Sequence, residues 1–196
     1  KKYYLQDIEP YWKWRDFYTA EEDEKSPFFG REYSEFQYTE KIYNYYIHPQ
    51  WDFFGSETLY LKLIYCDYKK KTAVIEFIGE WNDCIANDIM FLKRDFIDVL
   101  IDNGINKFIL IGENILEFFG AGNDYYEEWY EDIKDDGGYI IAINLREHIM
   151  EEMYQSNIHQ YININKTYND INWRKYKPFH FINYIDDLLI KVILSE

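Results

Sequence analysis

Three short apolar segments mark the stretch from Thr72 to Asn144: TAVIEFI at 72–78, KFILI at 107–111 and YIIAI at 139–143. Between them lie two segments with helical spacing, one beginning near Asn82 and the other near Asp124. An alternation of strands and helices favours parallel strands that are joined by crossover helices. The stretch therefore predicts an α/β fold on a single mixed, mainly parallel sheet.

The first helix of this stretch has apolar residues at steps of three and four, which predicts one buried stripe. These residues are Ile85, Ile89, Leu92, Phe96, Val99 and Leu100. Asn82 or Asp83 can cap its start, and Gly104 can end it.

Two further helices are expected on similar grounds. The spacing of Asp124 and Glu127 is like that of a capping box, and the helix it opens would bury Tyr126, Trp129 and Ile133. The next helix begins near Asn144, and its apolar side carries Ile149, Met150 and Met153.

The flanking segments extend the sheet and cover it. Residues 58–66 suit a strand that pairs antiparallel with 72–78. In residues 158–164, apolar and polar side chains alternate, which predicts an edge strand. Pro178 can begin a final helix. That helix would bury Ile182, Ile185, Leu189 and Val192 on one face.

The chain of 196 residues divides into three parts. Residues 1–56 are crowded with aromatic side chains and predict an N-terminal extension that packs on the main domain. Residues 57–170 form the α/β domain, and residues 171–196 form a C-terminal helical extension.

The net charge of −15 argues against nucleic-acid binding and against anionic lipids, because phosphates repel such a surface. A basic partner or a cationic ligand remains open, and the plainer interpretation is a charge that serves solubility. The absence of any apolar run of about 18 residues argues against membrane insertion. Cys66 and Cys84 stand apart, as expected of buried thiols in the reducing cytoplasm. Because the chain does not begin with Met, a removed leader stays open.

Aromatic residues make up 21% of the chain, which permits two interpretations. Tyr and Trp dominate the energetics of protein interfaces, so an interaction surface or self-association through the aromatic extension is one of them. The other is a codon bias, since Tyr, Ile, Asn and Lys are all abundant here.

The order of elements resembles that of the STAS domain, the fold of anti-sigma-factor antagonists. The resemblance covers roughly residues 57–170 and rests on a strand that ends in Gly79-Glu80, on the strand after Gly104, on the loop 120–123, and on the strand after Gly137-Gly138. Lipid-binding domains of the CRAL-TRIO type have a similar arrangement.

The STAS resemblance implies a regulatory protein–protein interaction module rather than an enzyme. In that family a phosphorylatable Ser or Thr lies in the loop before the second helix. Residues 115–124 contain neither, so a phosphorylation switch is not expected at this place.

Open parallel sheets bind ligands at the carboxyl ends of their strands. In this chain those ends supply a possible polar rim of Glu80, Asn82, Asp83, Glu113, Asn114 and Asn144. Glu80 and Glu113 could share a proton if they were desolvated together. The alternative is that the amides and Asp83 are helix caps and that the two glutamates are solvated.

No motif predicts a cofactor, a metal site or a catalytic residue. The four histidines have no ligand spacing, and His148, beside the expected rim, is the best placed as a general base. The loop with Gly120 and Gly122 precedes acidic residues that would repel a phosphate.

We therefore expect a non-catalytic, cytoplasmic interaction or regulatory module. By position alone, its contact surface would include Phe118, Phe119, Tyr125 and Trp129. The alternative is a small-ligand binder or an enzyme that uses the polar rim.

Overall fold

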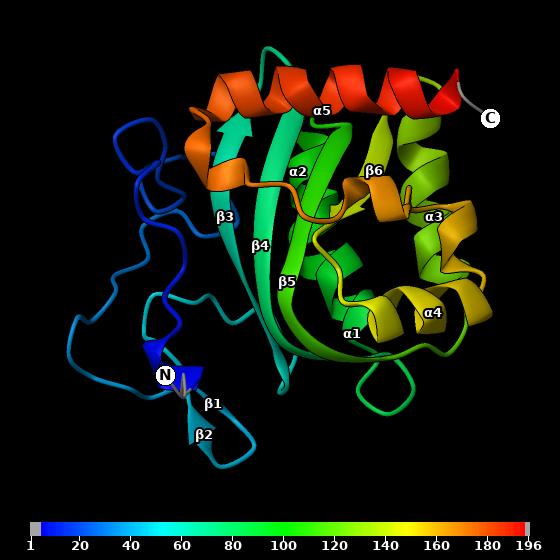
Figure 1. Cartoon of the computed structure of the whole chain (residues 1–196). Coiled ribbons are helices and arrows are strands. Elements are labelled where there is room, and N and C mark those ends of the chain that lie inside the picture. Colours follow the sequence, from blue (N-terminus) through cyan, green and yellow to red (C-terminus); the bar gives the residue numbers. More distant parts are fainter. Residues whose placement is uncertain (1–4, 195–196) are drawn as a thin grey trace.

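The computed structural model describes residues 5–194, and its centre is a four-stranded sheet with the order β3-β4-β5-β6 (Figure 1). The strands are β3 (Leu59–Asp67), β4 (Thr72–Asn82), β5 (Lys107–Phe119) and β6 (Tyr139–Ile143). β3 pairs antiparallel with β4, whereas β4, β5 and β6 are parallel. The predicted mixed, mainly parallel sheet and its antiparallel hairpin are confirmed, as is the predicted order of hairpin, helix, strand, helix, strand and helix.

The first crossover helix begins later than predicted. β4 continues to Asn82 because it pairs with the long β5, and Asn87 then takes a left-handed φ of 54° just before α1 (Asp88–Phe91). The expected start near Asn82 is therefore wrong. Ile85 lies in the preceding loop with 90% of its surface exposed, so it is not part of the buried stripe.

The remainder of that helix matches the prediction. α1 continues through a π-helical segment, η2 (Leu92–Ile97), into α2 (Asp98–Asp102). The predicted stripe residues Ile89, Leu92, Phe96 and Leu100 are buried. The chain leaves the helix at Gly104, whose φ of 89° suits glycine and whose amide donates to the carbonyl of Ile101.

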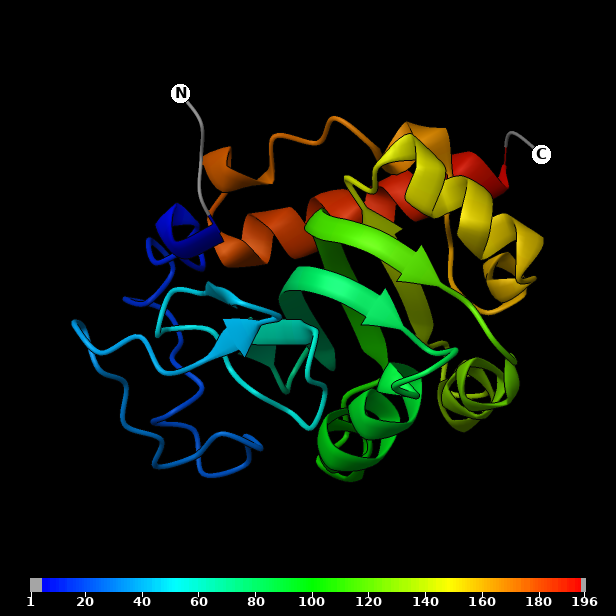
Figure 2. The ribbon, with the colours of Figure 1, turned by 90° about the horizontal axis from the view of Figure 1, so that it is seen from below.

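The other helices cover the two faces of the sheet. Helix α5 (Pro178–Ile193) crosses one face, while α1, α2 and α3 (Asp124–Lys134) lie on the other, as Figure 2 shows. Helix α4 (Glu147–Gln155) buries Ile149, Met150 and Met153 as predicted. None of the helices within residues 5–194 combines the length and apolar character required to cross a bilayer.

Short elements complete the chain. They are η1 (Leu5–Asp7), the hairpin β1 (Lys41–Ile42) and β2 (Tyr45–Tyr46), and the 3-10 turns η3 (Ile158–Gln160), η4 (Lys166–Tyr168) and η5 (Trp173–Lys175). The edge strand expected at 158–164 is wrong. The amides of Tyr161 and Ile162 turn back to the carbonyl of Ile158, and the segment pairs with β6 through an isolated bridge between Ile141 and Asn163.

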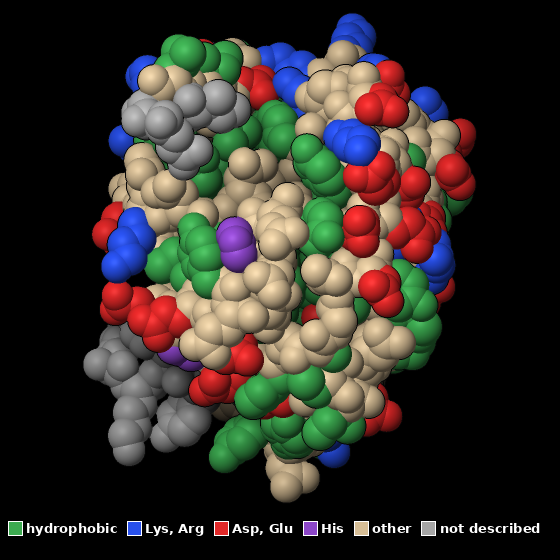
Figure 3. Space-filling model, turned by 90° about the vertical axis from the view of Figure 1, so that its right-hand side faces the viewer, with side chains coloured by type: hydrophobic (Ala, Val, Ile, Leu, Met, Phe, Trp, Pro, Cys, Tyr) green, Lys and Arg blue, Asp and Glu red, His purple; other side chains and the backbone are tan. Residues whose placement is uncertain are grey.

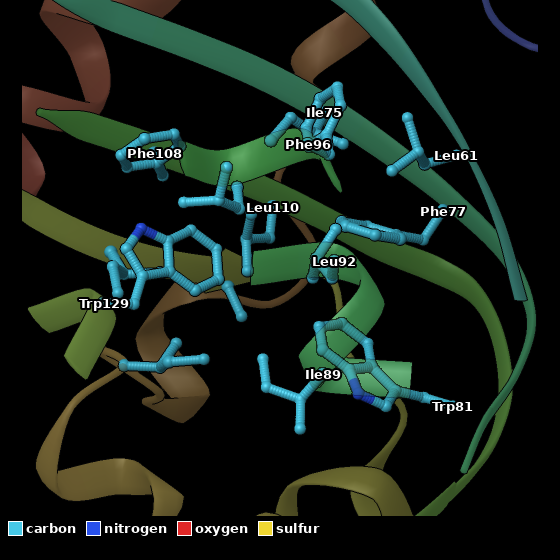
Figure 4. Packing of buried hydrophobic residues seen from close by; sticks show 14 of the residues in the cluster. Leu61, Ile75, Phe77, Trp81, Ile89, Leu92, Phe96, Phe108, Leu110 and Trp129 are labelled. Atoms are coloured by element: carbon cyan, nitrogen blue, oxygen red, sulfur yellow. The ribbon is translucent and has the colours of Figure 1, made fainter. Parts of the chain in front are cut away.

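The main core lies between the sheet and α1–α3, where Phe108 meets Trp129 edge to face with ring centroids 5.1 Å apart (Figure 4). A second core lies under α5 and includes Trp14 from the N-terminal segment together with Trp173 and Phe181. The indole of Trp14 donates to the carbonyl of Tyr176 at 3.0 Å. Residues near both ends of the described chain therefore pack together on one face of the sheet.

The N-terminal segment occupies part of the outer edge of β3, through one bridge between Asp52 and Leu61. Asp52 forms two backbone hydrogen bonds with Leu61, of 2.8 and 3.1 Å. Its buried carboxylate lies 3.2 Å from the ammonium group of Lys62, a largely buried side chain on the same strand. The pairing of β3 with β4 also shifts register between Leu63 and Tyr65.

Candidate functional site

The carboxyl ends of β4, β5 and β6 meet at one end of the sheet, the lower end in Figure 1. We call residues 80–87, 113–125 and 144 the strand-end rim. The strand predicted at 107–111 continues to Phe119, so Glu113 and Asn114 lie within β5 and not at its carboxyl end as expected. The two loops of the rim are joined directly, because the amides of Asp83 and Cys84 donate to the carbonyl of Phe119 at 2.9 and 3.3 Å. The thiol of Cys84 also lies 2.8 Å from the carbonyl oxygen of Gly120. These contacts fix the loops against each other.

Asp83 is the buried anchor of the rim. One of its carboxylate oxygens accepts a hydrogen bond from the hydroxyl of Tyr126 at 2.6 Å. The other accepts from the indole of Trp81 at 3.0 Å and from the amide of Ile89 at 2.9 Å. Burial raises the pKa of Asp83 to about 6, and these hydrogen bonds oppose the rise. The carboxylate thus ties the end of β4 to α1 and to α3.

Asn82 and Asp88 order the loop that follows β4. The side-chain oxygen of Asn82 accepts from the amide of Ile85 at 3.0 Å, and its amide group lies 3.4 Å from Glu80. Buried Asp88 accepts from the backbone amide of Asn82 at 2.8 Å, and burial raises its pKa. Polar side chains in and beside this loop therefore accept hydrogen bonds from the loop's backbone amides.

The other polar residues of the rim have partners from distant parts of the chain. Glu80 accepts from the hydroxyl of Tyr43 at 2.7 Å, whereas Glu113 forms an ion pair with Arg174. Asn144 uses its whole amide, because it accepts from the backbone N–H of Ile171 and donates to the carbonyl of the same residue, both at 2.9 Å. The structure thus gives the two glutamates different partners.

Two further candidate residues, Asn114 and His148, complete this account. Asn114 is half-buried on β5. The exposed ring of His148 lies 3.0 Å from the carbonyl oxygen of Leu116 and 3.7 Å from the carboxylate of Glu117. Among residues 5–194, no group of three or more His, Cys, Asp or Glu side chains could hold a metal ion.

The apolar residues that were predicted as a contact surface fall into two groups. Phe118 and Trp129 are buried in the main core. Phe119 is 41% exposed, and Tyr125 is half-buried with the guanidinium of Arg94 5.3 Å from its ring. Ile85, which the sequence pattern assigned to the core, is the most exposed large apolar side chain of the rim.

The side of the molecule that carries α3 and α4 shows how charge is distributed beside the rim. Acidic side chains gather where α3 lies, and hydrophobic side chains gather at the lower end of this face (Figure 3). The acidic residues of α3 are Asp124, Glu127, Glu128, Glu131 and Asp132. The lower end is the end at which β4 and β5 finish, so an apolar surface adjoins an acidic one.

The expectation for the cysteines is only half met. Cys66 is buried in β3, and burial raises its pKa to about 12. Cys84 was expected to be buried at a helix start and is exposed instead, because α1 begins four residues later. Both thiols are free.

Sequence reasoning missed the most unusual charged residue of the sheet, Glu76. It is fully buried in the middle of β4, where it accepts from the amide of Tyr11 at 2.9 Å and lies 3.4 Å from the guanidinium of Arg174. Burial raises its pKa to about 7, although both partners oppose this. A single glutamate within the apolar run 72–78 was the signal that could have revealed it.

No protein-family model matches the chain, and no curated protein matches it either. Among solved structures, the chain is similar to an anti-sigma factor antagonist. That protein is SpoIIAA in its unphosphorylated form, which is 11% identical to this chain with a TM-score of 0.45. The similar region covers 59% of this chain and 91% of that one.

Proposed function

We propose that this chain is a non-catalytic, regulatory protein-interaction module that binds its partner through the apolar part of the strand-end rim. The observation that carries this proposal is the exposure of Ile85 (90%), in the loop after β4, and of Phe119 (41%), the last residue of β5, on two segments that are hydrogen-bonded to each other. Tyr125, at the start of α3, packs against the main core, to which Phe118 and Trp129 belong. Apolar side chains held in a fixed position cost little entropy on binding.

The polar side chains of the rim support an interaction module over an enzyme or a small-ligand binder. Asn82, Asp83 and Asn144 are engaged in holding loops and helices together. Groups used in this way are not free to act on a ligand. A ligand site formed by these residues with Glu80, Glu113 and Asn114 is therefore the weaker alternative.

One feature supports a location in the cytoplasm, and another supports contact with a partner through the loops. Both cysteines are free, as is usual in a reducing compartment. The two outer edges of the sheet are partly occupied, at Leu61 by Asp52 and at Ile141 by Asn163. A partner would therefore bind more readily at the loops than by adding a strand of its own to the sheet.

The exposed thiol of Cys84 provides a direct test. A photoreactive maleimide on Cys84 should cross-link the partner in an extract of the source cells, and mass spectrometry would identify it. The double substitution Ile85→Ser and Phe119→Ser should abolish this cross-link, whereas Ile190→Ser, an exposed position on α5, should leave it intact. Circular dichroism would verify that each variant is folded. An unchanged cross-link in the folded double variant would rule out this surface.

A further inference from the structure

The N-terminal segment forms an open groove of about 420 Å³ at a distance from the rim. Its lining includes two exposed aromatic rings, those of Trp12 (52% exposed) and Phe36 (86% exposed). The other lining residues are Glu9, Arg15, Glu35, His48 and Gln50. In Figure 1 this segment lies to the left of the sheet, whereas α3 and α4 lie to the right.

The loop that carries Phe36 is ordered by its own hydrogen bonds. The hydroxyl of Ser34 accepts from the amides of Phe36 and Gln37, at 3.2 and 2.8 Å. Tyr38 packs edge to face on the ring of His48, with centroids 6.0 Å apart. The loop therefore holds the ring of Phe36 in solvent, where the ring would gain burial on binding.

The charges in the groove favour a cation. Glu9 and Glu35 contribute two carboxylates, whereas Arg15 donates to Gln50 at 2.7 Å and supplies one positive charge. His48 lies 3.5 Å from Glu9, and burial lowers its pKa, although Glu9 opposes this. Its imidazole is therefore mainly neutral at pH 7. The groove carries a net negative charge within a chain of −15, so a second copy of the chain is a poor occupant.

Elsewhere in the chain, guanidinium groups already lie close to aromatic rings. The guanidinium of Arg31 lies 4.4 Å from the ring of Phe28, and that of Arg174 lies 4.3 Å from the ring of Trp173. A guanidinium stacks on an aromatic face and binds a carboxylate through two parallel hydrogen bonds. The groove offers both kinds of partner, two rings and two carboxylates.

We propose that this groove binds an arginine side chain of a basic protein partner. The guanidinium packs against Trp12 and Phe36, and Glu9 and Glu35 accept its hydrogen bonds. This site does not depend on the strand-end rim, so either can fail while the other holds.

The test uses the full chain and a short Gly/Ser peptide that contains two arginines, with a peptide in which citrulline replaces arginine as the matched control. The indole N–H signal of Trp12 in NMR reports binding at the groove. We expect the arginine peptide to shift this signal in a saturable manner and the neutral citrulline peptide to leave it unchanged. Binding should weaken as salt is raised.

Variants separate the groove from general attraction to an acidic protein. Phe36→Ala should weaken binding about fivefold, the loss of one exposed cation–π contact, and the pair Glu9→Gln and Glu35→Gln should weaken it more. Phe29→Ala, an exposed aromatic outside the groove, should bind like the wild type. Equal binding of the citrulline peptide, an equal loss in Phe29→Ala, or no saturable shift of Trp12 would each overturn the proposal. A shift of the Trp12 signal that depends on protein concentration and not on added peptide would also overturn the proposal, because it would identify self-association.

Discussion

Glu76 allows the sharpest prediction, because a fully buried carboxylate makes stability depend on pH. Its pKa of about 7 in the folded protein compares with an ordinary value of 4.5. At 1.36 kcal/mol per pH unit, this difference corresponds to about 3 kcal/mol. Below pH 4.5 the carboxyl is protonated in both the folded and the unfolded chain, so it costs nothing. As the pH rises through 7 the folded chain must hold a buried charge, and stability is lost.

The substitution Glu76→Gln removes this charge and keeps an oxygen that can accept from the amide of Tyr11. We expect the variant to exceed the wild type in unfolding free energy by up to about 3 kcal/mol at pH 8. At pH 4.5 the two proteins should agree within about 0.5 kcal/mol. Urea unfolding followed by tryptophan fluorescence at both pH values measures the difference. Glu151→Gln, at an exposed position of α4, is the matched control and should show no such pH dependence.

One result would refute this reasoning. If Glu76→Gln were less stable than the wild type at pH 8, the attraction between the Glu76 carboxylate and Arg174 would outweigh the cost of burying the charge. That outcome is physically possible for a buried ion pair of good geometry, so the experiment decides between the two effects. A change in the urea m-value would instead indicate an altered unfolded state.

Two further predictions concern the rim. Tyr126→Phe removes a hydrogen bond to the buried carboxylate of Asp83 and should lower the unfolding free energy by about 2 kcal/mol at pH 7.5, and by less at pH 4.5, where Asp83 is protonated. Urea titrations at the two pH values check this, and an equal loss at both would contradict the role given to the charge. A maleimide should alkylate exposed Cys84 in the native protein and spare Cys66 until the chain is unfolded. Peptide mass spectrometry reads out both sites, and prompt labelling of Cys66 would disagree with its burial.

The sheet could be predicted because its signals are local. The apolar runs 72–78, 107–111 and 139–143 each became a strand, and Gly104 ends its helix as expected. The start of α1 was misjudged because Ile85 continues the helical spacing by coincidence. No local pattern reports that β4 extends to Asn82 by pairing with β5.

The partners of the rim residues could not be predicted, because they come from far along the chain. Tyr43 lies 37 residues from Glu80, and Arg174 lies 61 residues from Glu113. Such contacts depend on how the two flanking segments fold over the sheet. The sequence pattern placed Glu80, Asn82 and Asn144 correctly, at or near the carboxyl ends of β4 and β6, and left open which groups they meet. It was wrong for Glu113 and Asn114, because β5 continues to Phe119 and both residues lie within that strand.

The edge strand β3 has a consequence for how this protein behaves when it is crowded. An uncovered edge is a template on which another chain can add a strand and begin a fibril. Three features of β3 interfere with that growth: the pairing of Leu61 with Asp52, the inward ammonium group of Lys62, and the irregular register near Leu63. An incoming strand would have to displace Asp52 and leave the charge of Lys62 without its partner. The edge is thereby protected against fibril growth in a chain that is 47% hydrophobic.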